Sequence, residues 1–98
     1  MSAPWDDEAR PLYSIGQVAD MLDVRQAFLR RLDGFDVVSP ARSSGDQRRY
    51  SRRDIGQVQD AVALVDEGMT LAGVKRVFVL QERVRELEAE VARLRARR

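Results

Sequence analysis

The sequence predicts a mainly α-helical fold: a winged helix-turn-helix with a small β-hairpin wing, followed by a long C-terminal coiled-coil helix. Three observations support it. Two short amphipathic helices lie between residues 14 and 32, a turn rich in arginine lies between residues 41 and 53, and apolar residues spaced alternately by three and four run from residue 77 to residue 94. We therefore expect a leader over residues 1–11, a winged domain over residues 12–69 and a coiled-coil helix over residues 70–98.

The chain has 98 residues and contains neither cysteine nor histidine. A domain of this size is near the lower end of what folds alone, so help from a second subunit is expected. Without thiols, imidazoles or a glycine-rich phosphate loop, the sequence predicts no enzyme, no cofactor and no metal site. No signal peptide or membrane-spanning run is apparent, which makes the cytoplasm the expected location.

Residues 1–11 form the predicted leader. They hold Pro4, Pro11 and three consecutive acidic residues and have no apolar periodicity, so we expect this segment to be mobile. Trp5 is interpreted as an aromatic side chain that rests loosely on the domain.

The first predicted helix begins after Ser14, because Ser14 and Gln17 have the spacing of a capping box. A break at residues 22–24 then leads into a second helix over residues 25–32. The apolar residues of the two helices fall on their inner faces at helical spacing: Ile15, Val18, Ala19 and Leu22 in the first, and Phe28, Leu29 and Leu32 in the second.

A small hairpin is predicted after residues 33–36 end the second helix. The β-branched pair Val37 and Val38 is expected on one arm and residues 48–50 on the other, with the tip near Ser44 and Gly45. The tip of this hairpin would be the wing.

Two further helices complete the predicted fold. The third starts at Ser51 or at residues 53–54 and ends at residues 67–68, and Thr70 caps the last one. The last helix carries the apolar residues of a coiled-coil seam: Val77, Leu80, Val84, Leu87, Val91 and Leu94.

This seam predicts pairing with another helix, and the charges beside it allow either orientation. In a parallel pair Arg83 meets Glu88 of the partner helix. In an antiparallel pair Val77 lies opposite Leu94, and Arg83 meets Glu90. The alternative is a seam that folds back onto its own domain.

The formal net charge of +1 conceals two basic blocks. Residues 25–54 hold eight arginines against four aspartates, and residues 75–98 hold eight basic residues against four glutamates. Because a polyanion responds to the local field, these blocks matter more to a nucleic acid than the total charge does.

Several motifs resemble the MerR family of bacterial transcription regulators, in order and at the family's spacing over residues 12–76. They are Tyr13 to Ala19, Leu29-Arg30, Ser39-Pro40, Arg42, Arg48 to Tyr50, Asp54-Ile55 and Gly68 to Lys75. The resemblance implies a winged helix-turn-helix and a long helix that pairs antiparallel with its twin in a homodimer, so it favours the antiparallel option. Within the family the chain is most similar to the short heat-shock repressor type, HspR, through VSPAR, GDQRRYSRRDI and GMTLAGVKR. That type implies a chaperone co-repressor of the DnaK class.

The chain departs from the family's pattern at three positions. Phe28 stands where family members usually carry threonine, Leu32 where tyrosine is common, and Asp36 where glycine takes a left-handed turn. Aspartate tolerates that conformation, so the fold is expected to persist with altered DNA contacts. Metal-sensing members use cysteines that this chain lacks, and it ends after the coiled coil, so we expect no small-molecule effector domain.

DNA binding requires cations for the phosphates and a few side chains that reach base edges. At the start of the second helix, Arg25 and Gln26 are expected to meet bases, because both can bond purines bidentately. Arg30 and Arg31 are expected at phosphates. The alternative is that all four belong only to a solvated helical face.

In the wing, Arg42, Arg48 and Arg49 are expected to reach flanking phosphates or a narrow minor groove. Tyr50 is expected either to bond a phosphate through its hydroxyl or to be a core aromatic beneath the wing. Ser14 would cap the first helix and help its N-terminus to bind a phosphate. Residues 52–53 are expected to start the third helix without touching DNA, and the charged tail is expected to be a solvated surface.

The sequence therefore predicts a homodimeric, sequence-specific regulator, a repressor, that binds a two-fold site in double-stranded DNA and is associated with the nucleoid. The alternative is a coiled-coil interaction module whose DNA-binding domain no longer reads sequence. The first hypothesis requires the guanidinium groups of the second helix and the wing to lie on one side of the molecule. It also requires them to be free of ion pairs with Asp33, Asp36 and Asp46.

Overall fold

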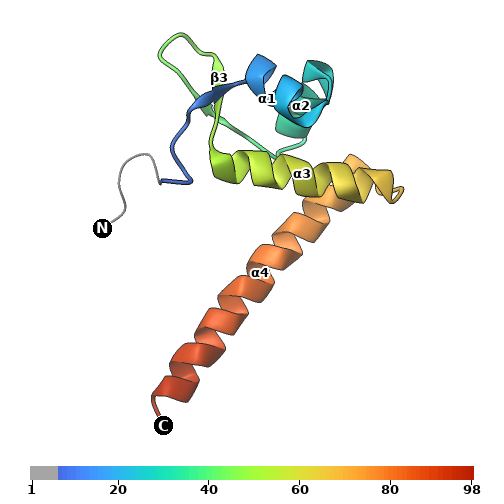
Figure 1. Cartoon of the computed structure of the whole chain (residues 1–98). Helices are drawn as coiled ribbons and strands as arrows, with labels where there is room; N and C mark the ends of the chain where they lie inside the picture. The colour runs from blue at the N-terminus through green and yellow to red at the C-terminus, as the bar shows by residue number, and fades with distance from the viewer. Residues whose placement is uncertain (1–6) are drawn as a thin grey trace.

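The computed structural model describes residues 7–98, which form four helices and a three-stranded antiparallel sheet (Figure 1). The predicted fold class is confirmed: the chain is mainly helical, with a winged helix-turn-helix followed by one long helix. Residues 1–6 of the predicted leader, with Trp5, lie outside the described residues. In chain order the elements are β1 (Tyr13–Ser14), α1 (Ile15–Leu22), α2 (Gln26–Gly34), β2 (Ala41–Arg42), β3 (Arg48–Tyr50), α3 (Arg52–Asp66) and α4 (Leu71–Ala96).

Hydroxyl side chains start three of the four helices. The Oγ atom of Ser14 accepts a hydrogen bond from the Gln17 amide at 3.2 Å, and the Ser14 amide donates to Oε1 of Gln17 at 2.8 Å, so the predicted capping box is present. Ser51 caps α3 in the same reciprocal manner, and Thr70 caps α4 as predicted. These caps satisfy amides that a helix leaves unpaired in its first turn.

Left-handed residues turn the chain between elements. Asp23 ends α1 at φ 52°, Asp36 follows α2 at φ 56°, and Gly68 separates α3 from α4 at φ 97°. The expectation that Asp36 takes the left-handed conformation is confirmed. Short polar side chains and glycine accept this region at the lowest steric cost.

The wing consists of β2, β3 and the turn between them. β3 is the central strand, paired with β1 on one side and β2 on the other, and Arg42 lies directly opposite Arg48. The tip at Ser44 and Gly45 is where the sequence predicts it, whereas β1 was not predicted.

The prediction that Val37 and Val38 lie on a strand is wrong. Both amides donate to the carbonyl of Leu32, at 2.8 Å and 3.3 Å, so this segment folds back over the end of α2. Both side chains are buried in the core. Valine is common both in strands and in buried positions outside strands, and here the two valines are buried without forming a strand.

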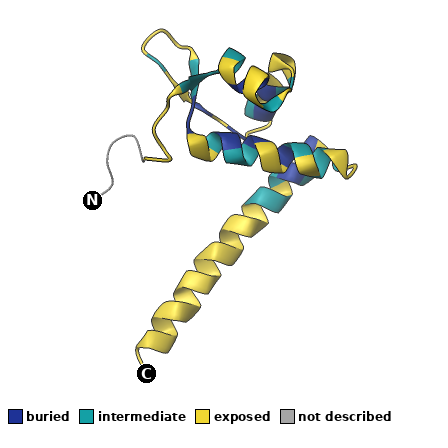
Figure 2. Ribbon diagram, in the orientation of Figure 1, coloured by how far each residue is buried: buried dark blue, intermediate teal, exposed yellow. Residues whose placement is uncertain are grey.

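The hydrophobic core lies among α1, α2, α3, the central strand and the first turns of α4 (Figure 2). Phe78 is the last α4 side chain packed against it, and every residue from 79 to 98 is exposed. The alternative in which the seam folds back onto its own domain is therefore not what the structure shows. No helix among residues 7–98 is long and apolar enough to cross a membrane.

Candidate nucleic-acid interface

The outer face of α2 carries polar side chains. Leu29 and Leu32 are buried against the core and Phe28 is half-buried, so the opposite face of the helix is the one left in solvent. All four candidates on that face are exposed as predicted: Arg25, Gln26, Arg30 and Arg31.

The start of α2 adjoins the start of α1. Nη2 of Arg30 donates to Oε1 of Gln26 at 3.1 Å, which holds the glutamine against the helix. The Nε2 atom of Gln26 lies 3.5 Å from the position that a Cβ atom would occupy at Gly16, so the starts of the two helices are close together. Because the Oγ atom of Ser14 already accepts from Gln17, a phosphate at this corner would be bound by the free amides of the first α1 turn.

The wing arginines are held by one carboxylate. Oδ2 of Asp33, in the last turn of α2, accepts from Nε of Arg48 at 2.8 Å and from Nη2 of Arg42 at 3.3 Å. Nη1 of Arg42 also donates to the carbonyl oxygen of Asp46 at 3.2 Å. The condition that the wing guanidinium groups be free of Asp33 is therefore not met by these two arginines.

The remaining candidate arginines are differently placed. Arg49 is half-buried and its Nη2 donates to Oε1 of Gln47 at 3.3 Å. Within the described part of the chain, the ion pairs include none from the wing's Arg49, from the α2 cap Arg25 or from Arg30 and Arg31 of α2. Four of the six candidate arginines thus make no ion pair with a carboxylate among residues 7–98.

Tyr50 belongs to the core. Its side chain is fully buried at the end of β3, and its hydroxyl has no hydrogen-bond partner among residues 7–98. Desolvation by burial raises the pKa of Tyr50 to about 12. This burial beneath the wing favours the core-aromatic alternative over the predicted phosphate contact through the hydroxyl.

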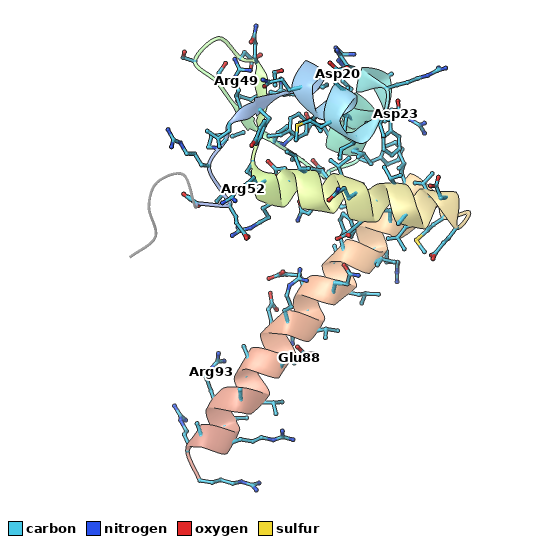
Figure 3. All side chains as sticks on the ribbon, in the orientation of Figure 1. Asp20, Asp23, Arg49, Arg52, Glu88 and Arg93 are labelled. Atoms are coloured by element: carbon cyan, nitrogen blue, oxygen red, sulfur yellow. The ribbon has the colours of Figure 1, made fainter. Side chains whose placement is uncertain are left out.

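The helix-turn-helix and the wing lie on one side of α3, and α4 leaves from the other (Figure 1). Figure 3 places Arg49 at the wing, whereas Glu88 and Arg93 lie far from it along α4. α2 and the wing, the two elements on which the hypothesis of DNA binding depends, thus lie on the same side of α3.

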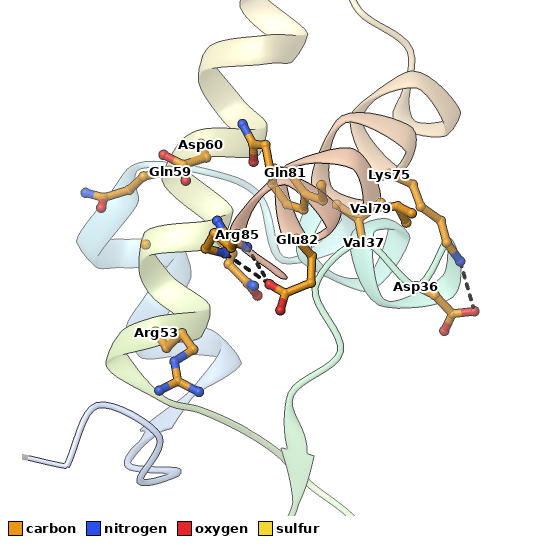
Figure 4. A pocket seen from close by; sticks show the side chains of 13 residues that line it. Asp36, Val37, Arg53, Gln59, Asp60, Lys75, Val79, Gln81, Glu82 and Arg85 are labelled. Atoms are coloured by element: carbon orange, nitrogen blue, oxygen red, sulfur yellow. Dashed lines mark hydrogen bonds and ion pairs between the residues drawn. The ribbon is translucent and has the colours of Figure 1, made fainter. Parts of the chain in front are cut away.

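A groove of about 770 Å³ lies away from this face, between α3 and α4 (Figure 4). Ion pairs on its walls join Lys75 to Asp36 at 3.7 Å and Arg85 to Glu82 at 2.7 Å. The groove was not predicted, because its walls come from segments that are separate in the sequence. In the part of the chain that the structure describes, no cluster of three or more acidic side chains is arranged to hold a metal ion.

Comparison with known proteins agrees with this architecture. Residues 13–80 match the family model described as MerR HTH family regulatory protein. A Streptomyces coelicolor protein named HspR is 41% identical over 90 residues, which covers 91% of this chain and 60% of that protein. The HTH-type transcriptional regulator GlnR of Bacillus anthracis is 31% identical over 77 residues, 79% of this chain and 60% of that regulator. The chain thus spans 60% of the length of both relatives.

A solved structure supports the same fold. HiNmlR, a MerR family regulator lacking the sensor domain and bound to promoter DNA, superposes with a TM-score of 0.62 at 17% identity. The superposition covers 85% of this chain and 79% of that one. At this identity the likeness concerns the fold alone, while the family match extends over more than half of the sequence. The chain therefore belongs to the MerR HTH family of regulatory proteins.

Proposed function

We propose that this protein is a homodimeric transcriptional repressor that reads a two-fold site in double-stranded DNA. The observation that carries the proposal is the shared position of the exposed α2 side chains and the basic wing, on the side of α3 away from α4 (Figure 1). A helix and a hairpin so placed can enter a major groove and reach the phosphates beside it. The family match supports this function over an enzymatic one.

Sequence reading is assigned to the start of α2. Gln26 can bond the edge of an adenine, and Arg25 can bond a guanine. Arg30 and Arg31 lie further along the helix and are assigned to phosphates. The amides of the first α1 turn beside Ser14 supply a further phosphate contact.

The wing is assigned to the flanking backbone. Arg42 and Arg49 are its phosphate contacts in this proposal, since Arg42 is exposed and Arg49 carries no ion pair among the described residues. Arg48 is the more enclosed partner of Asp33, and we assign it to the wing's own structure.

Dimerisation is assigned to the seam of α4. Five of its six apolar side chains are from 43% to 57% exposed, so in a single chain the seam leaves a continuous apolar stripe in water. We propose antiparallel pairing, with Val77 opposite Leu94 of the partner. Since the chain lacks cysteine, differently tagged V77C and L94C chains can be mixed and oxidised. Antiparallel pairing yields mixed cross-links, and parallel pairing yields only like-with-like ones.

The test of the whole proposal is selection of genomic fragments by the purified protein at several salt concentrations. We expect recovery of a two-fold motif, with affinity that falls by a slope of about 0.9 per phosphate contact in log–log form. Sedimentation of the same protein should give a dimer. A dimer that retains no fragment at any salt concentration would refute DNA binding. A monomer that pairs only with another protein would support an interaction module instead.

A protein co-regulator is proposed from the resemblance to the family alone. We propose a chaperone or other protein co-regulator, in a cytoplasmic, nucleoid-associated setting. Addition of a DnaK-class chaperone to the binding reaction is expected to tighten operator binding. An unchanged affinity would contradict a role for the chaperone as co-regulator.

A further inference from the structure

Asp33 joins the second helix to both arms of the wing. Its Oδ2 atom is the single acceptor for two guanidinium groups, from residues nine and fifteen positions further along the chain. Arg42 and Arg48 face each other across the hairpin, an arrangement of like charges that opposes strand pairing. One carboxylate between them offsets that repulsion, and the cluster keeps a net charge of +1.

The two arginines are not held equally. Arg48 donates through Nε at 2.8 Å and its side chain is 23% exposed. Arg42 donates through Nη2 at 3.3 Å and its side chain is 42% exposed. The shorter, more enclosed bond is the stronger one, because solvent screens it less. Arg42 is therefore the arginine that an outside anion can more easily detach from Asp33.

We propose that Asp33 occupies, in the free protein, the place that a DNA phosphate takes at Arg42. On this proposal, which rests on the proposed function, DNA binding moves Arg42 from Asp33 to a phosphate while Arg48 stays on the carboxylate. A carboxylate and a phosphate both accept charge-assisted hydrogen bonds from a guanidinium group, so each can replace the other. Asp33 thus competes with DNA of any sequence and limits binding to sites where α2 also fits.

The principal test is D33N, which removes the charge and keeps the shape. We expect binding to non-specific duplex DNA to tighten about two- to fivefold, the range that an exposed ion pair supplies. D36N is the matched control: it also removes one negative charge, but Asp36 pairs with Lys75 rather than with the wing. D36N should change the affinity by less than D33N does. Weaker binding by D33N would overturn the exchange and leave Asp33 as a structural brace alone.

A double-mutant cycle isolates the exchange from general charge effects. In an R42Q background, D33N should no longer tighten binding, because the arginine that moves is absent. In an R48Q background the gain should persist. A gain that survives in R42Q contradicts the proposal.

The salt dependence gives a second readout that does not use D33N. R42Q should reduce the log–log salt slope by about 0.9, the value for one lost phosphate contact, whereas R48Q should leave the slope unchanged. Thermal unfolding of each variant establishes that it is folded at the assay temperature. An equal loss of slope in both variants would refute the assignment. If the wild-type protein itself binds no DNA, the proposed function fails; if it binds and the variants behave otherwise than stated, only the exchange fails.

Discussion

Ser51 and Asp54 cap α3 reciprocally: the Ser51 amide donates to Oδ2 of Asp54 at 2.9 Å, and the Asp54 amide donates to Oγ of Ser51 at 3.0 Å. Ser51 is 5% exposed and stands directly after the buried Tyr50. This pair therefore fixes the point where the wing ends and α3 begins.

Replacing Ser51 by alanine should lower the free energy of unfolding by about 1–2 kcal/mol, because the variant loses the cap and leaves the partly buried Asp54 amide without its acceptor. Urea denaturation measures the change. Ser44→Ala, at the exposed wing tip, is the matched control and should change stability by less than about 0.5 kcal/mol. Equal effects of the two substitutions would show that the cap contributes nothing.

Tyr50→Phe should leave the free energy of unfolding unchanged or raise it by up to about 1 kcal/mol, since it removes a buried hydroxyl that has no partner among the described residues. Tyr50→Ala should lower it by about 3–5 kcal/mol, because it empties the core beneath the wing. DNA affinity of Tyr50→Phe should match the wild type. A loss of affinity in a fully stable variant would return the hydroxyl to the DNA interface.

The same residue predicts a loss of stability at high pH. Burial raises the pKa of Tyr50 to about 12 from 10.0, so between these values the unfolded chain releases a proton that the folded chain keeps. The contribution of Tyr50 to the free energy of unfolding is therefore fully present below pH 10. It falls by an amount on the order of 2 kcal/mol as the pH rises towards 12. Urea midpoints at pH 9 and pH 11.5 measure it. Tyr50→Phe should show a smaller decline, and an identical decline in both proteins would contradict the assignment.

Leu87→Arg should weaken the proposed dimer on the order of 100-fold or more, because it places a charge in the apolar seam. Sedimentation equilibrium measures the dissociation constant. Ala89→Arg introduces the same side chain on the opposite face of α4 and is the control that should leave the constant nearly unchanged. Should both variants remain dimeric, another surface joins the subunits.

Gln26→Ala should change which base is preferred, at a cost in discrimination of about 1–3 kcal/mol at one position of the site. Arg30→Ala should weaken binding to every sequence and lower the salt slope by about 0.9. Arg30→Lys keeps the charge and should retain the slope. Fragment selection followed by titration distinguishes these outcomes, and a Gln26→Ala protein with unaltered preference would move base reading to other residues.

Local signals predicted the helix starts well. The capping box of Ser14 and Gln17 and the cap at Thr70 involve residues three apart, so their spacing is visible in the sequence. The end of α2 was predicted less well: Asp33 and Gly34 were expected to break the helix, yet they form its last turn. Asp33 makes contacts there with the wing that no local pattern reveals.

Long-range packing decided what the sequence could not. Val37 and Val38 have side chains that favour strands, but both are buried in the core outside any strand. β1 is two residues long, too short for an alternating pattern. For the candidate site, periodicity correctly placed the α2 side chains outward. It could not show that Tyr50 is enclosed or that one carboxylate holds two wing arginines, because those facts depend on residues that meet only in the folded chain.

Beyond Phe78, the last side chain packed on the core, α4 continues for eighteen residues, about 27 Å at 1.5 Å per residue. If two copies pair antiparallel as proposed above, the length and register of this segment set the distance between their two α2 helices. On the proposed function, that distance determines the spacing of the two half-sites that the dimer can bind. In such a dimer, deleting one heptad would preserve the register of the seam and bring the two α2 helices about 10 Å closer, a shift of roughly three base pairs along the duplex.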